Sequence, residues 1–449
     1  MHAIVRPAYA LLARTASLAA ALAPAGEGKL ARAVHARRGV RARFAAWAAA
    51  HREAARPLLW VHAPSVGEGL QARPVLEWAR RARPDVQCVY TFYSPSAERF
   101  ARGLVERGLA DHADYLPFDT PGDAHALLDG LRPSALVFAK LDVWPVLVDA
   151  ARARGVRLGM VSATLAAGSS RTGGLAALLL RDAYAALDAV GAIAEDDAAR
   201  LRALGVRPER IRVTGDTRYD QVWARARAAE RDAARAAPPL APLLAPPGAH
   251  RFTLVAGSTW PADDAVLLPA WTTLAADRGA PPARLVVAPH EPTSAHLAPV
   301  AAWAERAGLT LARLSAVERG EATGDVDVLL VDRVGVLGDL YAVGQAAFVG
   351  GGFHAAGLHS VLEPAAFGLP VAFGPRHANS RDAGLLLARG GGTAPDDTGA
   401  LAATLRRWRD DEPTRVREGA AARALVESGL GADARTWTLV EALLPRVED

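Results

Sequence analysis

Two segments in the first half of the sequence place charged residues directly after apolar stretches, where side chains could perform chemistry. In WVHAPSVGEG (residues 60–69), Gly67 and Gly69 flank Glu68 just before a sequence typical of a helix. A helix N-terminus stabilises a carboxylate through its dipole and free N–H groups, so Glu68 could be only a capping acid. The alternative is a general base that accepts a proton from a substrate hydroxyl. Both interpretations remain open at this point.

Positive charge follows two other apolar stretches. LVFAKLDVWP (136–145) ends in Lys140 and Asp142, and VTGDTRYD (213–220) puts Arg218 in the loop after a predicted strand. Only two of the 52 basic residues are lysines, Lys29 and Lys140, which makes a lysine within a motif informative. Lys140 could stabilise developing negative charge, or it could be a surface lysine whose stem covers apolar groups.

The second half of the sequence carries the strongest signal, in residues 347–384. Gly350–Gly352 allow the backbone to approach a ligand closely. His359, Ser360 and Glu363 lie on a loop that enters a predicted helix, an arrangement that offers N–H groups to a phosphate and a carboxylate to ribose hydroxyls. VAGSTW (255–260) adds a Gly-Ser-Thr turn suited to anion contact. Together these segments predict a nucleotide site.

Several other chemistries find no support in the sequence. The histidines have no paired spacing such as H-E-x-x-H, and neither a Walker lysine nor a G-x-S-x-G motif occurs, so we expect no metal and no cofactor. Cys88 is the only cysteine, which excludes an internal disulfide and fits a reducing compartment. With half of the residues apolar and 22% charged, the chain is typical of a globular protein.

Short apolar stretches alternate with helical sequences, which predicts an α/β protein with parallel sheets. The predicted strands are residues 58–63, 87–92, 135–139, 157–163, 189–194 and 211–215, and then 252–258, 284–290, 327–332, 346–351 and 370–375. Between the two series, residues 237–249 hold five prolines and no charge, as a linker would. We therefore expect two doubly wound, Rossmann-like domains with ligands in a cleft between them.

The N-terminal end is basic. Residues 1–60 hold ten Lys or Arg and two Asp or Glu, whereas the rest of the chain has a slightly acidic balance. Residues 3–23 are apolar but interrupted by Arg6, Pro7 and Arg14, which makes a membrane-spanning helix poor and a helix at an anionic membrane surface more plausible. A cleavable signal peptide ending near ALAPAG and an ordinary packed helix are the alternatives.

These observations divide the chain into five parts. They are a membrane-associated basic segment (1–55), an acceptor-binding domain (56–236), the linker (237–249), a donor-binding domain (250–425) and a C-terminal helix that could pack on the first domain (426–449). The order of the motifs resembles one family, the 3-deoxy-D-manno-octulosonic acid (Kdo) transferases of lipopolysaccharide synthesis. The resemblance extends to about residue 392 and rests on HAPSVGEG, LPFD, KLDVWP, GDTRYD, GSTW, VDRVGVLGDLYA, GGGF, GLHSVLEPAAFG and FGPRHAN.

This resemblance implies a GT-B glycosyltransferase that moves Kdo from CMP-Kdo to a lipid A precursor, with inversion and without a metal. It would act at the cytoplasmic face of the inner membrane, and we expect no nucleic-acid partner; the oligomeric state stays open. The resemblance makes Glu68 the general base, and makes Lys140 and Arg218 stabilisers of the departing CMP or of the transition state. The donor-binding positions that it implies, together with the glycine loop, are Pro289, His290, Val334, Gly335, Val336, Gly351, Gly352, Ser360, Val361, Leu362, Glu363 and Asn379.

The chain departs from the family pattern at some of these positions. His290 stands where many members have a phosphate-binding arginine, and Lys140 where many have an acid. A transferase that uses another nucleotide sugar and an inactive relative that binds lipid or nucleotide are therefore the alternative functions.

Overall fold

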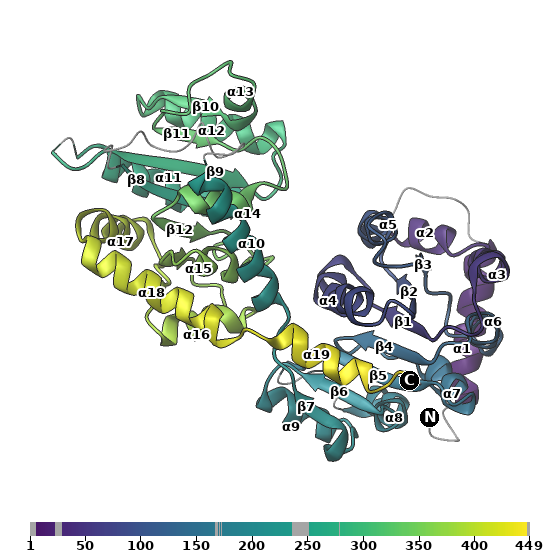
Figure 1. Ribbon diagram of the computed structural model, residues 1–449. Helices are drawn as coiled ribbons and strands as arrows, with labels where there is room; N and C mark the ends of the chain where they lie inside the picture. Colours follow the sequence, from purple (N-terminus) through teal and green to yellow (C-terminus); the bar gives the residue numbers. More distant parts are fainter. Residues whose placement is uncertain are drawn as a thin grey trace. The chain divides into compact units, whose positions relative to one another are not determined.

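The computed structural model describes residues 6–22, 29–166, 169, 171, 173–235, 251–277 and 279–446. The chain divides into two compact units, coloured along the sequence in Figure 1. Unit 1 comprises Met1–Arg218 and Gly431–Asp449, and unit 2 comprises Tyr219–Leu430. The chain therefore passes between the units twice. The predicted linker, residues 237–249, lies outside the described residues.

Unit 1 contains one parallel sheet of seven strands in the order β3-β2-β1-β4-β5-β6-β7. Its strands are β1 (Leu58–His62), β2 (Gln87–Phe92), β3 (His112–Tyr115), β4 (Ala135–Ala139), β5 (Arg157–Ala163), β6 (Ala189–Ala192) and β7 (Ile211–Val213). Its helices are α1 (Arg6–Leu22), α2 (Lys29–Ala36), α3 (Val40–His51), α4 (Val66–Ala82), α5 (Glu98–Glu106), α6 (Pro121–Leu131), α7 (Pro145–Ala153), α8 (Gly174–Ala185), α9 (Glu195–Ala203) and α19 (Ala432–Glu441). The strand order reverses between β1 and β4, where ligands of doubly wound sheets usually bind.

Unit 2 repeats this plan, with the strand order β10-β11-β9-β8-β12-β13-β14 and a reversal between β8 and β12. Its strands are β8 (Phe252–Thr259), β9 (Ala283–Pro289), β10 (Leu311–Arg313), β11 (Val328–Leu330), β12 (Ala346–Val349), β13 (Val371–Phe373) and β14 (Gly392–Thr393). Its helices are α10 (Arg218–Ala234), α11 (Pro261–Ala275), α12 (Ser294–Arg306), α13 (Leu314–Glu318), α14 (Leu337–Leu340), α15 (Leu362–Ala366), α16 (Arg381–Ala388), α17 (Thr398–Asp410) and α18 (Glu412–Ser428). The prediction of two parallel α/β sheets is confirmed.

The buried strands explain why both sheets form. All residues of β1, β2 and β4 are buried, as expected for parallel strands covered by helices on both faces. In unit 2 the apolar residues on opposite faces of β8, β9 and β12 belong to separate clusters, the first built around Trp271 and Trp408 and the second around Leu314 and Tyr341. Each unit therefore has its own hydrophobic core.

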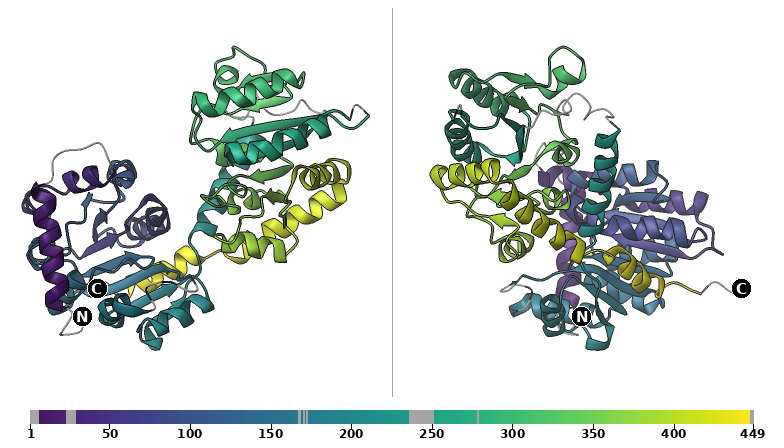
Figure 2. Two further views of the ribbon diagram at one scale, coloured as in Figure 1. Left: turned by 180° about the vertical axis from the view of Figure 1, so that it is seen from behind. Right: turned by 60° about the vertical axis from the view of Figure 1, so that its left-hand side comes forward.

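Two helices belong to a different unit from the element that directly precedes them in the sequence. Helix α10 packs through Tyr219 and Ala226 into a cluster of unit 2, although the sequence analysis assigned it to the first domain. Helix α19 returns to unit 1 and packs against α4, β5 and β6. Figure 2 shows α19 in yellow beside these strands. Leu443 approaches β5 so closely that a Cβ atom at Gly159 would lie 2.6 Å from its Cδ1 atom.

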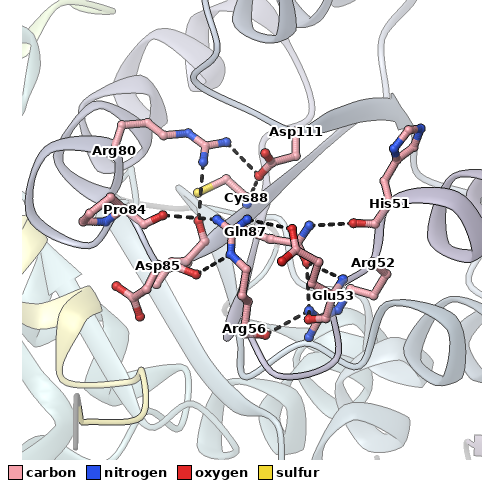
Figure 3. A network of polar contacts seen from close by, with 11 residues as sticks. His51, Arg52, Glu53, Arg56, Arg80, Pro84, Asp85, Gln87, Cys88 and Asp111 are labelled. Carbon is pink, nitrogen blue, oxygen red and sulfur yellow. Dashed lines mark hydrogen bonds and ion pairs between the residues drawn. The ribbon is translucent and has the colours of Figure 1, made fainter. Parts of the chain in front are cut away.

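A polar network fixes the amino ends of β1 and β2 (Figure 3). Gln87, the first residue of β2, accepts hydrogen bonds at Oε1 from Arg52 Nη1 (2.8 Å) and from the Glu53 backbone N–H (3.0 Å). Its Nε2 donates to the His51 carbonyl oxygen at 2.8 Å. Arg56 donates to the Asp85 carbonyl oxygen at 2.8 Å. The segment that leads into β1 is thereby tied to the segment that leads into β2.

The N-terminal helices belong to unit 1. Tyr9 of α1 donates a hydrogen bond to Asp119 at 3.0 Å, and Arg37, just after α2, is buried and lies 3.9 Å from the centroid of the Tyr93 ring. Leu11, Leu12 and Leu18 of α1 are exposed. Within the described residues, no helix is both long and apolar enough to span a bilayer.

Candidate functional site

Glu68 and Lys140 meet at the carboxyl edge of the unit 1 sheet. Glu68 lies in the first turn of α4, which follows β1, and Lys140 directly follows β4. Lys140 Nζ donates to Glu68 Oε1 at 3.0 Å, and the Ser65 hydroxyl donates to Oε2. The side chain of Glu68 is 19% exposed and that of Lys140 is 36% exposed, so solvent and substrate can reach the pair. Because Glu68 follows β1 and Lys140 follows β4, the pair lies where the strand order of this sheet reverses.

The backbone around Glu68 is shaped by a glycine that cannot be replaced without a clash. A Cβ atom at Gly69 would lie 2.6 Å from both Tyr90 Oη and Phe100 Cε1. This close approach sets the start of α4 against Tyr90 of β2 and Phe100 of α5. Burial and the charge of Glu68 raise the pKa of the Tyr90 hydroxyl. Gly69 thus serves packing, whereas a Cβ atom at Gly67 would meet only Ser65 Oγ, at 3.8 Å.

The backbone at Lys140 is strained. Its φ angle of 60° is uncommon for a residue with a side chain, and its N–H donates to the Val161 carbonyl oxygen at 2.9 Å. Such conformations cost of order 1–3 kcal/mol and cluster at functional sites. The strain accompanies a direct contact of the ammonium group with Glu68, which an ordinary surface lysine would not need.

Arg218 is connected to the same helix as Glu68. Its guanidinium forms a bidentate contact with Asp216 Oδ2, at 2.9 Å from Nε and 2.6 Å from Nη2. Gln71, three residues after Glu68 on α4, accepts a hydrogen bond at its carbonyl oxygen from the Thr217 hydroxyl (2.9 Å). Arg218 is the first residue of α10 and not a loop residue as predicted, and the backbone leading into it is fixed to α4 one helical turn after Glu68.

The segment after Lys140 forms one wall of a pocket of about 230 Å³ in unit 1. Asp142, Trp144 and Arg171 line it together with Tyr9 of α1 and Leu180 of α8. Trp144 Nε1 donates to His62 Nε2 at 3.2 Å, which fixes the ring of Trp144 against the buried end of β1. The pocket thus combines an apolar wall with one negatively charged side chain, Asp142, and one positively charged side chain, Arg171.

Asp119, of the LPFD motif, supports this wall from behind. It accepts hydrogen bonds from the backbone N–H groups of Val146 and Leu147 at the start of α7, at 3.0 and 2.9 Å. Burial raises the pKa of Asp119 to about 6, against the lowering effect of these N–H groups and of the Tyr9 hydroxyl. A buried carboxylate at this position holds the start of α7, and with it Trp144, in place.

In unit 2 an aromatic cluster forms at the carboxyl edge of the sheet. Trp260, after β8, stacks between His354 and His290, with ring centroids at 4.3 and 4.6 Å. Trp260 Nε1 donates to His359 Nε2 at 3.2 Å. Burial, reinforced by His290, lowers the pKa of His359, in keeping with a ring nitrogen that accepts this hydrogen bond. Three histidines, His290 after β9 and His354 and His359 from the loop between β12 and α15, are therefore assembled around one indole.

Asp263 holds the glycine loop against this cluster. The carboxylate is fully buried at the start of α11 and accepts hydrogen bonds from the backbone N–H groups of Gly351 (2.7 Å), Phe353 (3.1 Å) and Trp260 (2.9 Å). Gly351 has a φ angle of 93°, and a Cβ atom at Gly352 would lie 2.4 Å from the Gly374 backbone nitrogen. The loop therefore requires glycine at both positions.

A second group in unit 2 surrounds Glu363, the second residue of the short helix α15. Burial raises the pKa of Glu363; Arg225 opposes the shift and Asp339 adds to it. Arg225 pairs with Asp339 at 3.0 Å and donates to the Gly335 carbonyl oxygen at 3.1 Å. Arg225 thus connects the charged surroundings of Glu363 to the backbone at Gly335, which lies 28 residues earlier in the sequence.

The remaining predicted donor-site residues have diverse surroundings. Asn379 uses both amide atoms on the backbone of Leu358, at 3.2 Å each, so it braces the glycine loop. Ser360 and Val334 are exposed, whereas Val361, Leu362 and Val336 are buried. Pro289 ends β9, and the His290 N–H donates to the Thr259 carbonyl oxygen at 2.9 Å. Their roles in binding stay predictions.

Three residues of this arrangement were missed as site residues by the sequence analysis. Asp263 had a local signal, because its carboxylate three residues after Trp260 forms a capping arrangement at the start of α11. Asp119 lies in a quoted motif, but nothing in the sequence shows that it caps a helix 26 residues later. His354 had no spacing signal, because its partners come from other loops. Among the described residues, no group of three or more His, Cys, Asp or Glu side chains could hold a metal ion.

Comparison with known proteins identifies relatives of this chain. Residues 38–221 match the family model of 3-deoxy-D-manno-octulosonic-acid transferase (kdotransferase). The 3-deoxy-D-manno-octulosonic acid transferase of Bordetella pertussis is 34% identical over 389 residues, which cover 85% of this chain and 86% of that protein. The enzyme of the same name from Chlamydophila psittaci is 30% identical over 76% of this chain and 75% of its own.

Among solved structures, UDP-GlcNAc 2-epimerase from Neisseria meningitidis bound to UDP-GlcNAc superposes with a TM-score of 0.59 at 12% identity, over 86% of this chain and 99% of that chain. At this identity the likeness concerns the fold alone. The identity to the Bordetella pertussis enzyme over most of both sequences, with the motifs placed at the carboxyl edges of two Rossmann-like sheets, shows that this chain belongs to the Kdo transferase family.

Proposed function

We propose that the protein transfers Kdo from CMP-Kdo to a lipid A precursor, in an inverting and metal-independent reaction with Glu68 as the general base. The observation that carries the proposal is the contact of Glu68 with Lys140 at the reversal of strand order in unit 1. A capping acid needs only the N–H groups of its helix. A carboxylate that is held by a strained lysine and remains partly exposed is suited to proton transfer.

The proposed reaction is a displacement at the anomeric carbon of Kdo. The acceptor hydroxyl gives its proton to a Glu68 carboxylate oxygen while the hydroxyl oxygen forms a bond to the anomeric carbon of Kdo. The bond from that carbon to the CMP phosphate oxygen breaks, and its electron pair leaves with CMP. Lys140 and Arg218 supply positive charge where negative charge develops.

The donor is proposed to bind at the carboxyl edge of unit 2. Support comes from the glycine loop, whose backbone lies at the reversal between β8 and β12, and from the partly buried carboxylate of Glu363. The loop offers the close backbone approach that a phosphate requires, and a carboxylate can accept hydrogen bonds from ribose hydroxyls. His290, stacked on Trp260, takes the position of the arginine that many members carry.

The acceptor is proposed to use the pocket beside Lys140. Its wall of Trp144 and Leu180 suits the apolar part of a glycolipid, and Arg171 suits a phosphate group. On unit 1, Leu11, Leu12 and Leu18 of α1 are exposed, and Arg32 and Arg41 are exposed nearby in the sequence. These features support peripheral binding to the anionic cytoplasmic face of the inner membrane.

The decisive experiment is a transfer assay with purified protein, CMP-Kdo formed in situ and a tetraacyl lipid A precursor, analysed by mass spectrometry. We expect a product heavier by one Kdo unit, and further units would show how many are added. If no product forms while a known Kdo transferase works in parallel, the proposed donor or acceptor is wrong. The same assay with other nucleotide sugars then tests the alternative donors.

Membrane binding has its own test. The double variant Leu11→Asn/Leu12→Asn should sediment less with vesicles that contain anionic lipid than the wild-type protein does. The matched control is Val416→Asn, which removes an equally exposed apolar side chain from α18 of unit 2. Equal sedimentation of all three proteins would contradict a role of α1 at the membrane.

A further inference from the structure

A pocket of about 560 Å³ lies in unit 1 beside the edge strand β7. We propose that it binds a soluble organic phosphate, that is, a phosphate group attached to a compact apolar body. Its volume falls in the usual range for small-molecule sites, about 300–1,000 Å³. None of its lining residues belongs to the site described above, so the inference goes beyond the proposed transfer reaction.

The floor and one wall of the pocket are apolar. Ala189 of β6 pairs in register with Gly159 of β5, on which Leu443 packs, so Ala189 faces the side of the sheet that α19 covers. Helix α19 reaches β6, and Leu439 of α19 and Ala442, directly after this helix, form the wall. The face of β7 beyond them is left as an open ledge, which provides room for the apolar part of a ligand.

Three arginines surround this ledge. Arg212 pairs in register with Gly191 of β6, which puts its side chain on the pocket face, and Arg210 and Arg435 also line the pocket. Arg210 and Arg212 donate to backbone carbonyl oxygens, those of Asp188 (3.2 Å) and of Glu209 (3.1 Å). A neutral carbonyl does not compensate the charge of a guanidinium, so Arg210 and Arg212 bring positive charge to the pocket.

The two acids of the pocket do not cancel this charge, because each pairs with an arginine outside the lining. Asp188 lies 3.5 Å from Arg157 and accepts a hydrogen bond from the Leu158 N–H (2.9 Å), and Glu209 lies 4.0 Å from Arg207. Clustered guanidinium groups favour anions whose oxygens can accept paired hydrogen bonds, and phosphate is foremost among them.

Two buried polar atoms of the lining residues lack hydrogen-bond partners. They are Arg210 Nε and the hydroxyl oxygen of Thr214, a residue that is only 2% exposed. Buried donors of this kind are costly unless a partner satisfies them. The Thr214 hydroxyl lies over Gly191, where a Cβ atom would be 2.7 Å away, and therefore on the pocket face. An unpaired O–H donor on this face adds partial positive charge toward the pocket, which favours an anion.

The pocket adjoins both places where the chain leaves and re-enters unit 1. Arg435 Nε donates to the Thr214 carbonyl oxygen at 3.0 Å, and a Cβ atom at Gly215 would lie 3.0 Å from the Ala432 Cβ atom. The segment before the first passage, at Arg218, is thus bonded to the segment after the second, at Gly431. A ligand that contacts Arg435 and Thr214 would brace this junction.

The test is calorimetric titration of the full-length protein with phenyl phosphate. We expect one site, weakened about tenfold or more by Arg212→Gln, which removes a charged hydrogen-bond donor, and by Ala442→Trp, which fills the pocket. The matched control is Arg202→Gln on α9, an exposed arginine that does not line the pocket; it should bind within about twofold of wild type. Circular dichroism confirms that each variant is folded.

Three outcomes would overturn the inference. The first is no binding to the wild-type protein at about 10 mM ligand, beyond the weakest range of specific affinities. The second is equal binding by wild type and both pocket variants, which would put the ligand elsewhere. The third is binding of inorganic phosphate as tight as that of phenyl phosphate, which would exclude a role for the apolar ledge.

Discussion

The two edges of the unit 1 sheet use polar side chains in opposite ways. At the amino edge, Gln87 and Arg52 form hydrogen bonds with the backbone and with each other, around strands that are wholly buried (Figure 3). At the carboxyl edge, Glu68 and Lys140 bond to one another above a strained backbone and stay partly exposed. The polar groups at the amino edge bond within the protein, whereas the charged groups at the carboxyl edge stay accessible.

This difference separates stability from chemistry within one sheet. Backbone-directed hydrogen bonds lower the free energy of the fold, and they leave no charged group available to a ligand. Strain and partial exposure cost stability, and they are tolerated where a substrate must be reached. Substitutions at the amino edge should therefore change the free energy of unfolding, and substitutions at the carboxyl edge should change turnover.

The largest expected effect is that of Glu68→Gln. Loss of the general base should reduce transfer roughly a thousandfold, within the usual contribution of such a group. The melting temperature and the affinity for CMP should change little, because the amide keeps the shape and the proposed donor site lies in unit 2. Turnover is measured by the mass-spectrometric assay. Near-normal turnover would leave Glu68 as a capping acid only.

Asp119 tests the cost of burying charge near the carboxyl edge. Because its pKa is about 6 in the folded protein and 3.8 without the fold, the folded state holds a proton that the unfolded state loses between these values. Stability therefore falls as the pH rises from about 4 to 6, by roughly 3 kcal/mol for a shift of this size, and is constant above. Denaturation of wild type and Asp119→Asn across this window should show a difference that changes with pH. Parallel curves would contradict the assignment.

Lys140 should affect turnover more than stability. Lys140→Gln removes the charge beside Glu68 and should lower transfer about a hundredfold, as loss of an electrostatic stabiliser does. Lys140→Arg is the matched control, since it keeps the charge and should retain much more activity. If both variants behave alike, the charge of Lys140 has no part in the reaction.

The smallest effect should come from the amino edge. Gln87→Ala removes three hydrogen bonds to the segment before β1, so the free energy of unfolding should fall by about 2 kcal/mol. Turnover per folded molecule should stay within about twofold of wild type. Urea denaturation and the transfer assay, run on the same preparation, measure the two quantities. A large loss of turnover without loss of stability would erase the distinction between the edges.

The central strands of both sheets could be predicted from the sequence, whereas three of the four edge strands could not. The apolar stretches of β1, β4, β8 and β12 are continuous because these strands are covered on both faces. The strands that the sequence analysis missed, β3, β10 and β14, end their sheets, have two to four residues, and are partly exposed. Short edge strands lack the apolar signal on which prediction depends.

The site shows a similar limit. Glu68 and Lys140 were recognised because each follows a strand directly, and carboxyl ends of neighbouring parallel strands meet at one edge. The stack of His354 and His290 on Trp260 joins residues from three loops, and no local spacing encodes it. The role of Asn379 also differs in kind, because its amide braces the backbone of Leu358.

Cys88 gives the molecule a practical property. It is fully buried in β2, and burial raises the pKa of its thiol to about 12, so the reactive thiolate is scarce at neutral pH. Thiol reagents should leave the folded protein unmodified and react once β2 opens. Two cysteines introduced on the surface, one in each unit, can therefore carry spectroscopic labels without removal of Cys88, and the distance between the labels would measure the separation of the units in solution.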